Sequence, residues 1–192
     1  MNPIASTIAL VIRTLFEAYV VILLVRFLMQ KLRASWHNPL SQFVFQLTEK
    51  PLSLFRKFIP GYKGFDFAIL FFALIVQFIE VVILWKVLFG VNPALAGTLV
   101  ITIAKLLHTV IYIYIYGIII GAISTWIPSL QGNPFIQMID LITYPLLSKA
   151  RGIIPLIANI DLSPIFVILV LTVINTLFVT QLMALGTKMI LG

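Results

Sequence analysis

Long runs of apolar residues are the main pattern in the chain. A helix needs about 20 predominantly apolar residues to cross the hydrocarbon core of a bilayer, and four segments reach that length. They cover residues 4–29, 67–85, 106–127 and 164–189. The pattern predicts an all-α membrane protein with four transmembrane helices and both termini on the same side.

The segments within each pair of spans are not ordinary hydrophilic loops. Residues 39–59 and 134–160 are apolar, but prolines and charges interrupt them, and each is too short for another span. This pattern is typical of amphipathic helices that lie in the membrane interface. A re-entrant hairpin is the alternative, since backbone outside a helix is tolerated within the membrane where protein covers it.

Composition supports this interpretation and narrows the function classes. Of 192 residues, 61% are hydrophobic and 10% are charged, and the mean hydropathy of +1.14 is too high for a soluble globule. In a membrane protein, basic residues that give a net charge of +7 are expected to lie near the membrane surface. Nucleic acid is therefore not an expected partner. The expected partner is the lipid bilayer with its anionic lipids. A membrane-protein partner and a homo-oligomer both stay open.

Basic residues are distributed unequally between the two sides of the membrane. Residues 30–65 and 128–161 together hold eight, against two, Lys86 and Lys188, on the opposite side. The eight are Lys31, Arg33, Lys50, Arg56, Lys57, Lys63, Lys149 and Arg151. Because Lys and Arg are enriched in cytoplasmic loops, we expect both connecting segments in the cytoplasm and both termini outside.

The chain contains an internal repeat with an offset of 95 residues. The recurring residues include Tyr19 and Tyr114, Asn38 and Asn133, Pro39 and Pro134, Thr48 and Thr143, Arg56 and Arg151, Pro60 and Pro155, and Asp66 and Asp161. The offset divides the chain into repeat one, residues 1–95, and repeat two, residues 96–192. Each repeat has an even number of spans, so both enter the membrane in the same direction and form parallel repeats.

These shared residues resemble the YggT family, also called YlmG, of bacterial and plastid membrane proteins. The family pattern is Asn-Pro, then Thr-Glu-Pro, then Arg with a nearby Ile-Pro, then Asp before the next span. Repeat one carries it as Asn38, Pro39, Thr48, Glu49, Pro51, Arg56, Ile59, Pro60 and Asp66, and repeat two as Asn133, Pro134, Thr143, Tyr144, Pro145, Arg151, Ile154, Pro155 and Asp161. The pattern is broken by Lys50 in repeat one and by Tyr144, which replaces the acid, in repeat two.

The resemblance implies two classes of function. Members of the family are implicated in tolerance of osmotic stress and cation balance, others in nucleoid and division organisation, and plastid relatives in haem attachment to a thylakoid cytochrome. Such a spread indicates a shared scaffold. The first hypothesis is a bacterial inner-membrane protein of ion or osmotic homeostasis, with both termini in the periplasm and in one version cation-conducting. The second is a non-conducting scaffold or assembly factor that docks partners on its cytoplasmic elements.

The repeated motif has a physical interpretation of its own. Its prolines remove backbone donors and are expected to bound short helices, with Asn-Pro beginning a turn. Thr48 and Thr143 are expected to cap helices that the following prolines begin. Arg56 and Arg151 each precede an aspartate by ten residues, which predicts an Arg–Asp ion pair in each repeat. We expect the motif to be mainly architectural, with partner docking, gating and lipid recognition as alternatives.

Ionisable residues within the spans are the second candidate site, because each costs at least about 2.5 kcal/mol at the bilayer centre. Repeat one has Arg13, Glu17 and Glu80, which are expected to pack together. At the same offset, repeat two has His108, Tyr112 and Asn175. The cluster is interpreted either as a buried ion pair that fastens two helices or as a site for an ion or proton. Lys105 is expected to extend its amine outward toward the interface.

The sequence offers no set of catalytic residues. It has no Gly-rich phosphate loop, no HExxH pair and no cysteine. We therefore expect neither an enzyme nor a bound cofactor or metal.

Overall fold

The computed structural model describes residues 3–59, 61, 64–154 and 161–191, and within these residues the chain is helical, with no strand. Four segments are long and apolar enough to cross a membrane. They are α1 (Pro3–Lys31), α3 (Phe67–Phe89), α4 (Leu95–Ser124) and a fourth segment made of α6 (Ser163–Ile174), the π-helical turn η2 (Asn175–Val179) and α7 (Thr180–Leu191). The predicted all-α membrane fold is confirmed.

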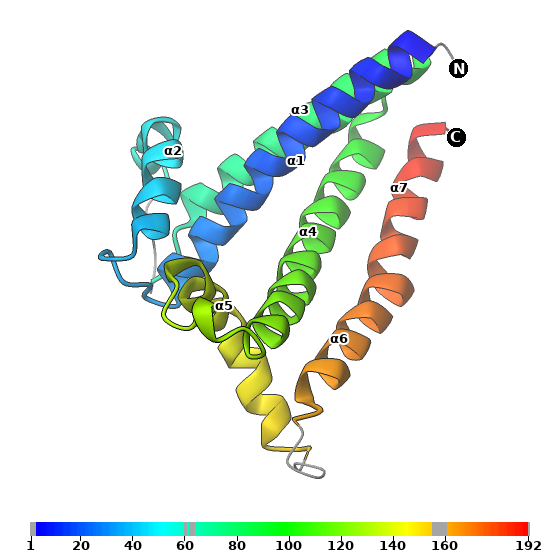
Figure 1. Cartoon of the computed structure of the whole chain (residues 1–192). Coiled ribbons are helices and arrows are strands. Elements are labelled where there is room, and N and C mark those ends of the chain that lie inside the picture. The colour runs from blue at the N-terminus through cyan, green and yellow to red at the C-terminus, as the bar shows by residue number, and fades with distance from the viewer. Residues whose placement is uncertain (1–2, 60, 62–63, 155–160, 192) are drawn as a thin grey trace.

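The two repeats form two helical hairpins. α1 packs along α3, α4 packs along α7 and, to a lesser extent, α6, and α3 with α4 makes the main contact between the hairpins. Both chain ends lie at one end of the bundle and both connecting helices lie toward the other (Figure 1). We call these the terminal end and the connector end. The hairpins run in the same direction, as expected of parallel repeats.

The third span differs from its predicted position. It begins at Leu95, not at residue 106, and ends at Ser124, not at residue 127. Polar side chains lower the hydropathy of its first turns, but the Thr98 and Thr102 hydroxyls each donate to the carbonyl one turn earlier, at 2.8 Å. Satisfied in this way, they fit within an apolar helix. The correction places Lys105 and His108 well inside the span.

Each connecting segment forms one amphipathic helix, α2 (Pro39–Arg56) in repeat one and α5 (Pro134–Arg151) in repeat two. The buried face of α2 carries Ser41, Val44, Thr48 and Leu52, at helical spacing. Neither helix folds back on itself, so within the described residues the interfacial helix fits and the re-entrant hairpin does not. A short 3₁₀ turn, η1 (Pro128–Leu130), precedes α5.

Two of the prolines predicted to bound these helices, Pro51 and Pro145, lie inside α2 and α5 instead. A proline inside a helix removes one backbone donor and usually costs about 3 kcal/mol. In α2 the carbonyl left without that donor belongs to Leu47, which is exposed. A polar headgroup or water can satisfy an exposed carbonyl, so the helix continues through the proline.

Asparagine, not threonine, caps the connecting helices. Asn38 Oδ1 accepts from Leu40 N at 2.9 Å and Asn133 Oδ1 from Phe135 N at 2.8 Å, with a proline following each cap. The predicted capping roles of Thr48 and Thr143 are wrong. Both lie in mid-helix, where their hydroxyls donate to the carbonyls of Val44 and Ile139. The helix satisfies them locally because the real start is ten residues earlier.

Two glycines allow α4 and α7 to approach closely near the terminal end. A Cβ atom on Gly97 would lie 2.6 Å from the carbonyl oxygen of Gly186, and one on Gly186 would lie 2.6 Å from Ile101 Cγ1. Small residues at such crossings bring helix backbones together in membranes, where packing replaces the hydrophobic effect as the driving force. This contact therefore sets the spacing of the second hairpin.

Candidate functional site

Two carboxylates of repeat one share one lysine of repeat two inside the membrane. Lys105 Nζ on α4 lies 2.6 Å from Glu80 Oε1 on α3 and 3.0 Å from Glu17 Oε1 on α1. The Glu80 side chain is fully buried, whereas 43% of the Glu17 side chain is exposed. We call these three residues the Lys105 cluster. It joins three spans and both repeats.

Gln77, one turn before Glu80 on α3, is a further polar residue, absent from the predicted site. Its amide nitrogen donates to Glu80 Oε2, and the side chain is fully buried. Its Oε1 atom has no hydrogen-bond partner among the described residues. A polar residue three positions from a buried acid, within a span, was the available signal.

Arg13 lies near enough to Glu80 for its charge to act on that acid, but it is not the ion-pair partner of Glu17 or Glu80. Its side chain is exposed, and no ion pair involves it in the described part of the chain. Lys105 supplies the positive charge instead of extending outward. The sequence pattern does not predict this role of Lys105, because a third span that begins at residue 106 leaves Lys105 outside the membrane and restricts the pairing to repeat one.

The corresponding residues of repeat two form a polar group of their own, as expected. His108 Nδ1 lies 2.8 Å from Asn175 Oδ1, and the His108 and Tyr112 ring centroids are 4.4 Å apart. Because the amide oxygen accepts, the imidazole Nδ1 donates. Asn175 begins the π-helical turn of the fourth span, and its backbone carbonyl accepts from the Thr180 hydroxyl at 3.1 Å. Such turns often occur at functional positions.

A cavity of about 400 Å³ lies between the repeats and connects the two polar groups. Glu17, Lys105, His108 and Tyr112 contribute to its walls. Its remaining lining is mainly apolar and reaches α5 through Phe135, Met138, Ile139, Ile142 and Thr143. The cavity therefore extends from a polar group within the membrane toward the connector end.

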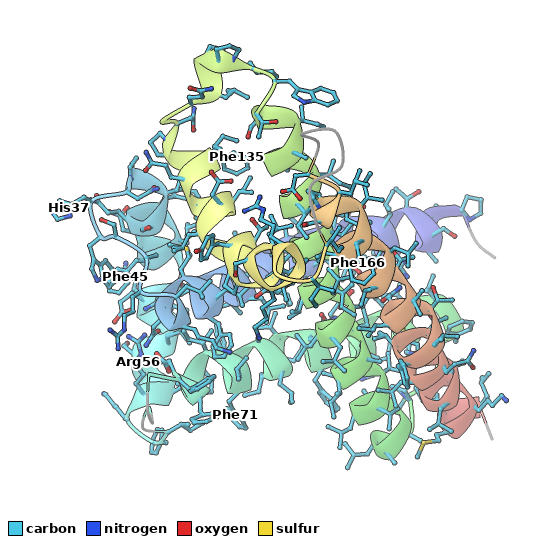
Figure 2. All side chains as sticks on the ribbon, turned by 90° about the horizontal axis from the view of Figure 1, so that it is seen from below. His37, Phe45, Arg56, Phe71, Phe135 and Phe166 are labelled. Carbon is cyan, nitrogen blue, oxygen red and sulfur yellow. The ribbon has the colours of Figure 1, made fainter. Side chains whose placement is uncertain are left out.

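A chain of four charged side chains, the arginine network, holds α2 against α1 and α3. Arg26 of α1 donates to Glu49 of α2, Arg56 of α2 contacts Glu49 at 3.0 Å, and Arg56 contacts Asp66 at 2.7 Å. Asp66 also accepts from Ala68 N at 3.1 Å and so caps α3. The predicted Arg56–Asp66 pair is confirmed, and Figure 2 shows Arg56 on the same side of the molecule as Phe45.

Arg26 is the buried member of this network. Its guanidinium also donates to the Thr48 hydroxyl and to the Phe45 carbonyl, and it lies 4.6 Å from the centre of the Phe45 ring. Burial raises the pKa of Glu49, but Arg26 and Arg56 together lower it below its ordinary value. The acid is therefore ionised at neutral pH, as an ion-paired network requires.

Repeat two keeps only half of the network. Arg151 Nε contacts Asp161 Oδ2 at 2.7 Å, as predicted, and Asp161 Oδ1 accepts from Ser163 N at 2.9 Å. Burial raises the pKa of Asp161, but the hydrogen bonds from Arg151 and Ser163 lower it overall. The positions that correspond to Arg26 and Glu49 hold Gly121 and Tyr144. Both partners of that ion pair are thus absent together.

The two Asn-Pro turns meet across the repeats. Asn38 Nδ2 donates to the carbonyl of Pro134 at 2.8 Å, and Asn38, Pro39 and Pro134 contribute to the walls of a cavity of about 330 Å³. Asn133 caps its own helix and takes no reciprocal bond in the described residues. Pro60 and Pro155, the last prolines of the motif, lie outside the described residues.

Among the described residues no group of three His, Asp or Glu side chains is placed to hold a metal ion. The arrangement can instead separate charge and exchange protons, because an acid, an amine and an imidazole line one cavity.

Comparison with known proteins gives one family. The model of the CCB3/YggT family matches residues 5–87 and again residues 100–182. An uncharacterized protein of Pseudomonas aeruginosa is 33% identical over 175 residues, covering 91% of this chain and 89% of its own. The uncharacterized protein YggT of Escherichia coli K12 is 32% identical over 189 residues, covering 97% of each chain. No solved structure matches.

Proposed function

The chain belongs to the CCB3/YggT family, and from this premise and the geometry of the Lys105 cluster we propose that it acts in cation and osmotic homeostasis in the bacterial inner membrane. In this proposal the cluster binds either one proton or one monovalent cation between the two repeats. The observation that carries it is the single lysine shared by two carboxylates beside an intramembrane cavity.

Charge arithmetic gives the reason. With both acids ionised, Glu17, Glu80 and Lys105 together carry two negative charges and one positive charge. An uncompensated charge within the membrane costs several kcal/mol. Either protonation of one carboxyl or entry of a cation neutralises the excess, so the two events are linked. A site of this kind exchanges a proton for a cation.

The cavity provides a route for a proton or cation from the Lys105 cluster toward the connector end. It runs from Glu17 and Lys105 past His108 toward α5 at the connector end. His108 lies along this route, and its imidazole ring can accept a proton at one nitrogen and donate one from the other. The proposal requires no cofactor and no catalytic step.

Ion flux in proteoliposomes tests the proposal. The purified full chain should carry a cation or proton flux above that of protein-free liposomes, and Glu80→Gln should reduce it at least tenfold while remaining folded. Lys86→Gln, at the exposed end of α3, is the matched control and should keep the flux. Flux equal in wild type, Glu80→Gln and protein-free liposomes would contradict the proposal.

A scaffold role is the second candidate. It is favoured by the Asn38–Pro134 hydrogen bond, which joins the connecting segments of both repeats into one surface at the connector end. Under this alternative, site-specific cross-linking from α2 and α5 should capture one partner protein reproducibly, and Asn38→Ala should weaken that capture. The Glu80→Gln variant should leave the capture unchanged.

A further inference from the structure

A cavity of about 610 Å³ lies between the connector end of α1 and α2, away from the Lys105 cluster. Three arginines, Arg26, Arg33 and Arg56, contribute to its walls, and Asp66 is the acid among them. Arg26 and Arg56 are held by the arginine network. In the described part of the chain, the side chain of Arg33 has neither an ion pair nor a hydrogen bond.

The charges around this cavity do not balance. Three arginines and one acid, Asp66, line the cavity. Glu49, which is not in the lining, pairs with two of these arginines, Arg26 and Arg56. One positive charge is therefore not compensated. Arg33 is the member without a partner. Its guanidinium presents a planar set of donors that matches a phosphate group in two-point contact.

The backbone of Arg33 adds a second, independent observation. Its φ of +55° is left-handed, the only such value for a non-glycine residue in the described residues. Arg33 follows the last turn of α1, where Ala34 N donates to Met29 O at 2.9 Å and closes the helix. Glycine usually occupies this position, because other residues are strained there. A strained residue that brings an unpaired charge to a cavity indicates a functional constraint.

The position of the cavity fits the level of lipid headgroups. Trp36 contributes to its wall, and 63% of that residue is exposed. Tryptophan is enriched at the boundary between the hydrocarbon core and water. The cavity lies at the end of a transmembrane helix and beside an interfacial helix, where phosphate groups are abundant.

We propose that this cavity binds one phosphate group, with Arg33 as its principal ligand. The group belongs either to the headgroup of an anionic phospholipid or to a soluble phosphate compound. Repeat two has Gly121 and Pro128 at the positions of Arg26 and Arg33, so each chain has one such site.

Native mass spectrometry of the full chain in detergent tests the site, with phosphatidylglycerol and phosphatidylcholine as probes. Wild type should bind one phosphatidylglycerol in preference to phosphatidylcholine. Arg33→Gly should weaken this binding at least about fivefold, the change expected for one basic residue near an anionic surface. Arg33→Lys should keep part of the preference. Lys149→Gln, which removes an exposed charge from α5, is the matched control and should bind as wild type does.

Arg33→Gly also separates binding from folding. Glycine relieves the left-handed strain, so the melting temperature of the variant should equal or exceed that of wild type. Inorganic phosphate identifies the source of the group. A rise in melting temperature over chloride at equal ionic strength, in wild type and not in Arg33→Gly, would assign a soluble phosphate ligand, and phosphatidylglycerol binding without that rise would assign a lipid.

Two results would overturn the proposal. One is an equal loss of lipid binding in Arg33→Gly and Lys149→Gln, which would make the attraction a general effect of charge. The other is a wild-type protein that neither prefers phosphatidylglycerol nor responds to inorganic phosphate. Cation flux through the Lys105 cluster is measured separately, so either result would leave the proposed function standing.

Discussion

Lys105 supplies the one positive charge that Glu17 and Glu80 share, and its removal is expected to be the most damaging single change inside the membrane. Lys105→Met leaves two carboxylates uncompensated, which should lower the free energy of unfolding by about 3–5 kcal/mol. Denaturation of the purified protein in detergent measures this change. Lys188→Met, an exposed lysine near the terminal end, is the control and should have little effect.

Removing the whole cluster should be milder than removing its lysine. The triple variant Glu17→Gln, Glu80→Gln, Lys105→Met has no buried net charge, and well-packed neutral replacements of buried ion pairs are often tolerated. If the triple variant were as unstable as Lys105→Met, charge balance would not be what holds these residues together.

Glu49 makes the stability of the protein depend on acidity. Its pKa is lowered in the folded protein, so the unfolded chain binds the proton more readily. The contribution of the arginine network is therefore complete above the ordinary glutamate pKa of about 4.3 and is lost as the pH falls through the lower, folded value.

Melting temperatures between pH 7 and pH 3 test this dependence. Wild type should lose stability steeply below about pH 4.3, and Glu49→Gln should start lower and decline less. Lys50→Gln, an exposed neighbour on the same helix, should follow the wild-type curve. Parallel curves for wild type and Glu49→Gln would exclude the acid as a source of the decline.

Sequence alone predicts two of the residue pairs that lie within one repeat. Arg56 with Asp66 and His108 with Asn175 both follow from the offset of 95 and from opposite or complementary polar groups. The sequence does not predict the Arg26–Glu49 pair, which also lies within repeat one, because repeat two has no corresponding polar pair to reveal it. Repeat two has Gly121 and Tyr144 at the two corresponding positions, so both charges are missing there together. That joint loss is the sequence signal that could indicate the pair.

At the scale of elements, the glycine contact between α4 and α7 sets how closely the second hairpin packs. Gly97→Val would place its Cβ atom 2.6 Å from a backbone oxygen and force the helices apart. We expect a loss of about 1–3 kcal/mol, as for other overpacked sites, measured by denaturation in detergent. Ala96→Val, on the exposed side of the same turn, is the matched control and should be near neutral.

The hydrophobic pattern predicts which helices exist better than it predicts where each helix begins and ends. Spans one, two and four lie within a few residues of their predicted bounds, whereas α4 begins eleven residues early. Threonine hydroxyls that donate to a carbonyl of their own helix are satisfied within the membrane. A hydropathy scale counts these residues as polar all the same. The pattern also predicts the two connecting helices, but it assigns Pro51 and Pro145, which lie inside them, to helix ends.

At the scale of the whole molecule, parallel repeats place both termini at one end and both connectors at the other. The distribution of charge predicts that the connector end faces the cytoplasm. The chain has no cysteine, so single cysteines report topology without background. Each connecting segment needs one labelling position. Two candidate positions, Tyr62 and Ile157, lie outside the described residues, so we choose the exposed residues Ser53 and Ser129.

Labelling in intact cells distinguishes the two orientations. Ser53→Cys and Ser129→Cys should resist a membrane-impermeant maleimide until the inner membrane is opened, and Val91→Cys, in the loop between α3 and α4, should react at once. Reaction of Ser53→Cys in intact spheroplasts would reverse the assignment. Both connectors should give the same answer, because an even number of spans separates them.

We propose that the Lys105 cluster holds either one proton or one cation at a time. Infrared difference spectroscopy measures this directly, because a protonated carboxyl has a carbonyl stretching band that its ionised form lacks. Adding a monovalent cation to the wild-type protein should remove one carboxyl band and release one proton for each chain. Glu80→Gln should abolish both changes, and Lys86→Gln should keep them. A wild-type protein whose carboxyl bands do not respond to any alkali cation, or a response that survives in Glu80→Gln, would contradict the account.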